Sequence, residues 1–98
     1  MIEIRETAAY ASWFAGLVDQ RARVKVLIRL RRLSLGNPGD VRAVGRGVSE
    51  LRIDWGPGLR VYYVQRGDAL VILLGGGDKS SQARDILRAV DLARRLAK

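Results

Sequence analysis

Alternating apolar and polar residues predict three β-strands, at residues 2–5, 48–54 and 59–66. The apolar side chains of these segments largely recur at every second position, which is typical of a sheet with one buried face. The run from Ala69 to Leu74 has no polar alternation and predicts a central strand that is covered on both faces. Gly75 to Gly77 are expected to end this strand.

The two middle strands are predicted to pair as an antiparallel hairpin. Gly56-Pro57-Gly58 forms a loop with an odd number of residues, and this parity keeps the apolar sets of both strands on one face. The other face of the hairpin is then expected to carry Arg52, Arg60 and Tyr62 together.

Apolar residues at helical spacing predict a pair of helices between the first two strands. Thr7 is the expected N-cap of a helix over residues 8–17. Asp19 is the expected N-cap of a longer helix that reaches about Leu35. The following segment, residues 36–47, is rich in glycine and small residues and is predicted to be a loop.

A last helix is predicted over residues 81–97, with Asp78 or Ser80 as its N-cap. Its buried stripe is expected to comprise Ala83, Ile86, Leu87, Val90 and either Ala93 or Leu96. The resulting order, β-α-α-β-β-β-α, predicts an α+β fold within one domain over residues 1–98. The helical pair and the C-terminal helix are expected to pack on a small, mainly antiparallel sheet.

Composition narrows the classes of function. The chain has no cysteine and no histidine, so neither disulfides nor thiolate or imidazole metal sites are expected, and we predict no metal and no cofactor. Eighteen basic and ten acidic residues leave a net charge of +8, which favours nucleic acid or an acidic protein as partner. The start of the chain does not resemble a signal peptide, and no apolar run approaches the ~20 residues of a spanning helix. We therefore expect a cytoplasmic protein that does not insert into membranes.

Candidate chemistry gathers on the polar face of the hairpin. Two guanidinium groups, Arg52 and Arg60, and the phenol of Tyr62 suit the stabilisation of charge on a phosphate. The structural alternative is a ladder of ion pairs in which Glu50 and Asp54 neutralise these arginines across the strands.

Lys79 is a second candidate, because it follows three glycines at the start of a helix, where backbone N–H groups favour a phosphate. Without histidine, an attack by a ribose 2′-hydroxyl on a phosphate would need a lysine, a tyrosine or a carboxylate as its base. The alternative is a surface lysine beside a capping aspartate. Lys79-Ser80 is not a P-loop, since Leu73 and Asp78 occupy the two positions that this motif reserves for glycine.

A basic stripe along the second helix is a candidate surface for RNA or the ribosome. Its members are Arg21, Lys25, Arg29 and Arg32. Arg84 extends the basic character onto the last helix. Such a stripe suits phosphate contacts without sequence readout, although a solvated helix face has the same pattern. The second helix also has two apolar sides, which indicates either burial between layers or contact with a partner.

Residues 58–86 carry a resemblance to a known family. The segments Gly58-Leu59-Arg60-Val61-Tyr62-Tyr63-Val64, Gly75-Gly76-Gly77 and Asp78-Lys79-Ser80-Ser81-Gln82 resemble toxins of the RelE/ParE superfamily of toxin–antitoxin pairs. They are most similar to the HigB-like branch of addiction module killer proteins. This resemblance implies a RelE-like fold and a prokaryotic mRNA interferase, an endoribonuclease that inhibits translation by cleaving mRNA on the ribosome.

The resemblance also implies roles and partners. Arg60 and Arg52 stabilise the phosphorane, Lys79 handles protons, and Tyr62 stacks or transfers a proton. Near Arg84, the family's best-known member has a catalytic tyrosine that this chain lacks. The implied partners are the ribosome with its mRNA and a helix-turn-helix antitoxin, with operator DNA bound only through the toxin–antitoxin complex. Two alternatives remain open: a ParE-like gyrase poison that is not an enzyme, and a plain basic RNA-binding module.

Overall fold

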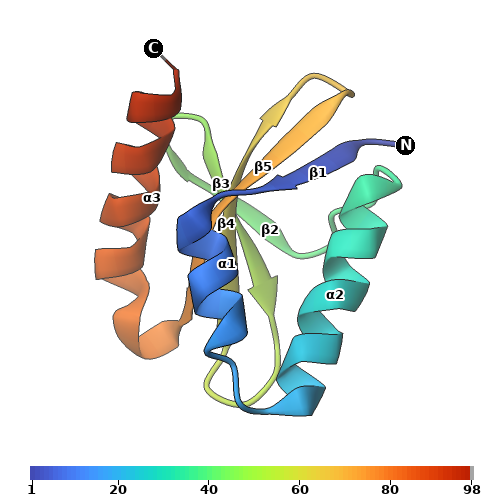
Figure 1. The fold of residues 1–98 in the computed structure, drawn as a ribbon, viewed down its shortest axis with the longest axis vertical. Coiled ribbons are helices and arrows are strands. Elements are labelled where there is room, and N and C mark those ends of the chain that lie inside the picture. The colour runs from blue at the N-terminus through green and yellow to red at the C-terminus, as the bar shows by residue number, and fades with distance from the viewer. Residues whose placement is uncertain (98) are drawn as a thin grey trace.

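A computed structural model, which describes residues 1–97, contains a five-stranded sheet and three α-helices (Figure 1). The elements are β1 (Glu3–Glu6), α1 (Ala8–Ala15), α2 (Gln20–Ser34), β2 (Val41–Gly45), β3 (Val48–Ile53), β4 (Leu59–Arg66), β5 (Leu70–Asp78), a 3-10 turn (Lys79–Ser81) and α3 (Gln82–Leu96). The expected α+β class is confirmed, and the arrangement is consistent with a RelE-like fold. Among residues 1–97, no helix combines the length and the apolar character needed to cross a bilayer.

The strands lie in the order β1-β5-β4-β3-β2. β1 runs parallel to β5, and every other neighbouring pair is antiparallel. The predicted parity of the β3–β4 hairpin is confirmed, because the paired residue numbers sum to an even value and Arg52 shares a face with Arg60, which lies directly opposite it. The connection spans residues 54–58 and not only Gly56-Pro57-Gly58, but its odd length preserves the parity on which the prediction rested.

One strand lies where a loop was predicted, so the expected element order was short by one strand. Val41–Gly45, within the segment 36–47, forms β2 and pairs antiparallel with β3. The prediction was wrong because glycines dominate the local sequence pattern here. Pairing depends instead on the free edge of β3, whose backbone N–H and C=O groups need partners.

The glycines after Leu74 do not end the strand, as was predicted, since β5 continues through them to Asp78. None of the three has a positive φ angle. A Cβ atom on Gly76 would overlap the ring of Trp13, and one on Gly77 would overlap the carboxylate of Asp85. These glycines therefore let α1 and α3 approach the sheet closely on its two faces.

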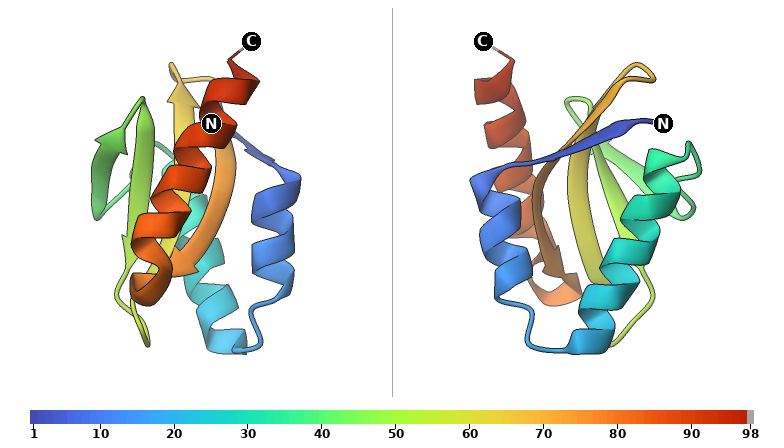
Figure 2. Two further views of the ribbon diagram at one scale, coloured as in Figure 1. Left: turned by 90° about the vertical axis from the view of Figure 1, so that its left-hand side faces the viewer. Right: turned by 45° about the vertical axis from the view of Figure 1, so that its right-hand side comes forward.

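The sheet buries both faces (Figure 2). On one face, α1 and α2 cover a core of residues that includes Tyr10, Val26, Leu51, Val61 and Leu73. On the other face, α3 covers a smaller core that includes Val48, Tyr62, Leu74, Ala89 and Ala93. The predicted N-caps of the first two helices are confirmed: the Thr7 side chain accepts from the backbone N–H of Tyr10, and Asp19 accepts from that of Arg21.

The buried stripe of α3 agrees with the predicted one in part. Ala93 is buried and Ile86 and Val90 pack partly buried against the core, as predicted. The buried residues of the helix are Asp85, Ala89 and Ala93, which recur every four positions, while Leu87 is 72% exposed. Leu96 is also exposed. Ala89 and Ala93 are small because the glycines of β5 let α3 pack closely on the sheet, and such close packing leaves little room for large side chains.

Candidate functional site

Arg52, Arg60 and Lys79 line one depression at the loop end of β3 and β4. Its volume is about 430 Å³, and its other lining residues are Asp40, Asp54, Gly56, Pro57 and Gly58. Strand pairing brings the three cations together, since Arg52 lies opposite Arg60 and Asp78, the neighbour of Lys79, lies opposite Leu59. Three separate elements therefore contribute one cation each.

Arg60 is the most buried of these cations, with a side chain that is 12% exposed. Its Nε lies 3.9 Å from Oε1 of Glu50, and its Nη1 donates to the carbonyl of Leu59 at 3.2 Å. Gly58 adopts a φ of 84°, and a Cβ there would contact the Arg60 guanidinium and the Cβ of Lys79. The Arg60 guanidinium therefore lies between the Leu59 carbonyl and Gly58, while its buried Nε has no hydrogen-bond partner among residues 1–97.

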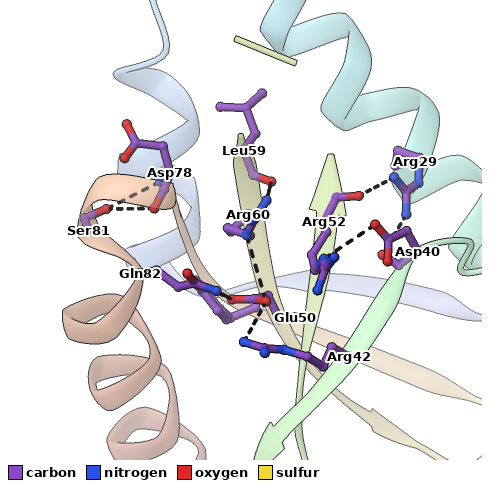
Figure 3. Close-up of polar contacts among 11 residues, drawn as sticks. Arg29, Asp40, Arg42, Glu50, Arg52, Leu59, Arg60, Asp78, Ser81 and Gln82 are labelled. Carbon is purple, nitrogen blue, oxygen red and sulfur yellow. Dashed lines mark hydrogen bonds and ion pairs between the residues drawn. The ribbon is translucent and has the colours of Figure 1, made fainter. Parts of the chain in front are cut away.

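Glu50 is the charged centre beneath this depression, and it is fully buried (Figure 3). Tyr62 donates its hydroxyl to Oε2 at 3.1 Å, and Gln82 donates its Nε2 to the same oxygen at 2.8 Å. Arg42 approaches Oε1 at 3.5 Å, beside Arg60. A buried carboxylate requires such compensation. Glu50 thus connects β2, β3, β4 and α3 around Arg60.

Tyr62 lies below the surface and not in the depression. Its side chain is fully buried and its phenol donates to Glu50. Burial, together with the negative charge of Glu50, raises the pKa of Tyr62 above its ordinary value. The expected roles in stacking and proton transfer do not fit this position, because a buried neutral phenol neither contacts a base nor ionises readily.

Arg52 and Arg29 are tied to the same end of β3. The Nε of Arg52 lies 3.5 Å from the exposed carboxylate of Asp40. Arg29 donates to the carbonyls of Arg52, Pro38 and Asp40 at 2.6, 2.9 and 3.1 Å. Burial lowers the pKa of Arg29. Arg29 therefore links α2 to the end of β3 through hydrogen bonds. Its guanidinium is used in these contacts and does not belong to the predicted RNA-binding stripe.

The predicted ion-pair ladder is present in a modified form: Glu50 contacts Arg60, but Asp40 and not Asp54 contacts Arg52. Among residues 1–97, neither Asp54 nor Lys79 takes part in an ion pair within 4.0 Å. The depression is therefore lined by one ammonium, Lys79, and one carboxylate, Asp54, that have no ion pair among residues 1–97.

Lys79 begins the short turn that leads into α3. Asp78 caps this turn, and its carboxylate accepts from the backbone N–H of Ser80 at 2.8 Å. Hydrogen bonds from the Ser80 side chain and backbone lower the pKa of Asp78. The N–H group of Ser80 is thus occupied by the Asp78 carboxylate and is not open to a phosphate.

The outer side of α2 is apolar and open to solvent. Its large apolar residues are 46–59% exposed: Val24, Leu27, Ile28 and Leu35. Arg21 and Lys25 border a groove beside them, with Lys25 Nζ 5.0 Å from the ring centre of Trp55. Arg32 is also exposed. The second apolar side expected for this helix therefore has no partner within residues 1–97.

Arg84 lies apart from this stripe, on α3. It is exposed, and its Nε is 3.6 Å from the carboxylate of Asp85. It lines a different hollow, between α1 and α3. The sequence thus located two separate basic surfaces but could not assign Glu50 its buried role. The sequence indicates only that Glu50 lies on the same face of the alternating strands as Arg52 and Arg60. Gln82, at a helix start, gave no signal.

Comparison with known proteins places these features in a family. Residues 12–98 match the family described as "Phage derived protein Gp49-like (DUF891)". The chain is also 47% identical over 95 residues to an uncharacterised protein of Haemophilus influenzae, covering 97% of this chain and 96% of that protein. The Gp49-like family is associated with toxin–antitoxin systems. The chain therefore belongs to the Gp49-like family of phage-derived proteins, a family of addiction-module toxin type.

Proposed function

We propose that this protein is the toxin of a toxin–antitoxin pair and an endoribonuclease that cleaves mRNA on the ribosome. The observation that carries the proposal is the convergence of Arg52, Arg60 and Lys79 on one depression, with the Nε of Arg60 3.9 Å from the buried carboxylate of Glu50. Pre-oriented cations stabilise charge that develops on a phosphate, and they need little rearrangement during the reaction.

The proposed reaction is an attack of a ribose 2′-hydroxyl on the adjacent phosphate. The 2′-oxygen forms a bond to phosphorus while the bond to the 5′-oxygen breaks, which leaves a 2′,3′-cyclic phosphate and a free 5′-hydroxyl. Asp54, the carboxylate of the depression without an ion pair among residues 1–97, accepts the proton of the 2′-hydroxyl. Lys79 donates a proton to the departing 5′-oxygen, and the guanidinium groups of Arg60 and Arg52 stabilise the phosphorane.

The ribosome is proposed to hold the mRNA in a reactive geometry. Such positioning lowers the barrier without additional side chains, which suits a site with few ionisable groups. Arg21, Lys25 and Arg32 are proposed to contact ribosomal RNA through its phosphates, and the net charge of +8 favours this encounter.

The proposed protein partner is a helix-turn-helix antitoxin that docks an acidic amphipathic segment on the outer side of α2. Support comes from the exposed apolar residues of α2 and from the basic border formed by Arg21 and Lys25. Complementary charge steers an acidic segment to this surface and apolar burial then stabilises it. Operator DNA is proposed to bind only the toxin–antitoxin complex.

The test is a double variant, Arg60→Ala with Lys79→Ala, expressed briefly in bacteria. We expect loss of growth arrest and loss of new transcript 5′ ends, while far-ultraviolet circular dichroism shows an intact fold. Arg66→Ala, an exposed arginine on the same strand β4, is the matched control and should retain both activities.

Two other outcomes would replace the proposal. Unchanged growth arrest in the double variant, together with inhibited supercoiling, would identify a gyrase poison that acts through a protein contact. RNA binding that weakens steeply with salt, without growth arrest by the wild type, would identify a basic binding module.

A further inference from the structure

A second hollow of about 420 Å³ lies between α1 and α3, over the end of β5. Its walls include Trp13 from α1 and Arg84 and Arg88 from α3, and its floor is the glycine segment Gly75–Gly77. α1 and α3 stand on opposite sides of this end of β5 (Figure 2). We refer to this hollow as the α1–α3 cleft.

The cleft exists because β5 extends beyond the end of β1, its parallel neighbour. β1 ends at Glu6, which pairs with Leu73, and the chain then turns into α1. Thr7 closes the pairing by donating its hydroxyl to the carbonyl of Leu73 at 2.8 Å. Beyond this point β5 carries Gly75–Gly77, of which Gly75 is open, since a Cβ built on it meets nothing within 4 Å.

The lining has the chemistry that a nucleotide requires. Trp13 is partly buried against Gly76 and offers an aromatic surface for a base. Arg84 and Arg88 are exposed cations. Arg84 is paired with Asp85, a carboxylate that also lines the cleft, whereas Arg88 has no ion pair among residues 1–97. Aromatic surfaces that stack bases and arginines that contact phosphates are the usual components of single-strand binding sites. The volume is also within the range of small-ligand sites.

The cleft adjoins the candidate active site along the chain. Leu59 and Asp78 line the cleft, while the next residues, Arg60 and Lys79, line the depression of the three cations. The two hollows therefore meet at the same ends of β4 and β5, and the proposed RNA path runs from the depression past Lys79 to the cleft.

We propose that the α1–α3 cleft binds the nucleotide next to the scissile phosphate, with its base against Trp13 and its backbone phosphate on Arg84 and Arg88. This inference rests on the proposed function, because it extends the same RNA path. It makes the cleft a determinant of which base stands beside the cut.

The test fills the cleft without touching the three cations. In Gly75→Val, the new side chain enters open space, and the φ angle of Gly75 is not positive, so the fold should persist. Arg88→Ala removes the unpaired cation. Arg94→Ala, on the same helix but paired with Asp91, is the charge-matched control.

Two readouts are measured: binding of a short single-stranded RNA by fluorescence anisotropy, and the bases at cleavage sites by mapping of transcript 5′ ends. We expect Gly75→Val and Arg88→Ala to weaken RNA binding about 10-fold each, the order of one lost stacking or phosphate contact. The base preference beside the cut should broaden in Gly75→Val. Arg94→Ala should match the wild type, and thermal melting should show all three variants folded.

The failures of the two proposals are distinguishable. If folded Gly75→Val and Arg88→Ala bind RNA as the wild type does and cleave at the same bases, the nucleotide site in the cleft is refuted. The nuclease proposal is still supported in that case if Arg60→Ala loses cleavage. Absence of cleavage by the wild type overturns the nuclease. In that case the cleft has no scissile phosphate beside it, and only nucleotide binding is left to test: weaker RNA binding in both cleft variants supports a nucleotide site there, and wild-type binding in both overturns it.

Discussion

Removal of the Glu50 carboxylate tests whether a buried charge holds the candidate site together. In Glu50→Ala, the guanidinium of Arg60 loses the carboxylate beneath it, and the donors of Tyr62 and Gln82 lose their shared acceptor. The variant also leaves a void, because Glu50 is fully buried among β3, β4 and α3. All three effects destabilise the fold.

The magnitude follows from the geometry. Removal of one partner of a buried ion pair costs roughly 3–5 kcal/mol. The lower end applies, since the two ion contacts are long, at 3.5 and 3.9 Å, and Arg42 is half exposed to water. We therefore expect Glu50→Ala to lower the free energy of unfolding by about 3 kcal/mol. For a domain of this size that corresponds to a fall in Tm of roughly 12–24 °C.

Two further variants separate charge from packing. Glu50→Gln keeps the shape and one acceptor for Tyr62, so we expect a smaller loss of about 1–2 kcal/mol. Glu3→Gln removes an exposed partner of Arg5 and should change stability by less than about 0.5 kcal/mol. Urea unfolding followed by circular dichroism measures all three. A loss below about 1 kcal/mol in Glu50→Ala would refute the view that this carboxylate organises the site.

Three further predictions concern the glycine strand, α2 and alkaline pH. Gly77→Ala should destabilise by about 1–3 kcal/mol, because its Cβ overlaps Asp85, whereas Gly75→Ala should be neutral or stabilising; thermal melts compare them. Leu27→Glu with Ile28→Glu should abolish binding of the cognate antitoxin in calorimetry while growth arrest persists, and retained binding would exclude this face. Burial and Glu50 raise the pKa of Tyr62, so the fold favours its neutral phenol. The resulting stability is complete below the ordinary value of 10.0 and is lost as pH rises above it, and phenolate absorbance should appear at higher pH in the folded protein than in urea.

The parts of this protein that follow from short-range periodicity were predictable from the sequence. The two-residue repeat of β3 and β4 and the odd loop between them placed Arg52 and Arg60 on the same face of the sheet. The hydrogen-bonding capacity of Thr7 and Asp19 located the starts of α1 and α2. These features depend on residues that are close together in the chain, so local sequence contains the necessary information.

Other parts depend on what packs against what, and only the tertiary structure decided them. β2 forms because β3 has a free edge, and β5 continues through its glycines because Trp13 and Asp85 occupy the space of the missing side chains. Glu50 and Tyr62 share a face with Arg60, as the alternation indicates, but their burial arises from α3 closing over that face. Periodicity assigns a side chain to a face of the sheet, whereas its depth depends on contacts between segments that are distant in sequence.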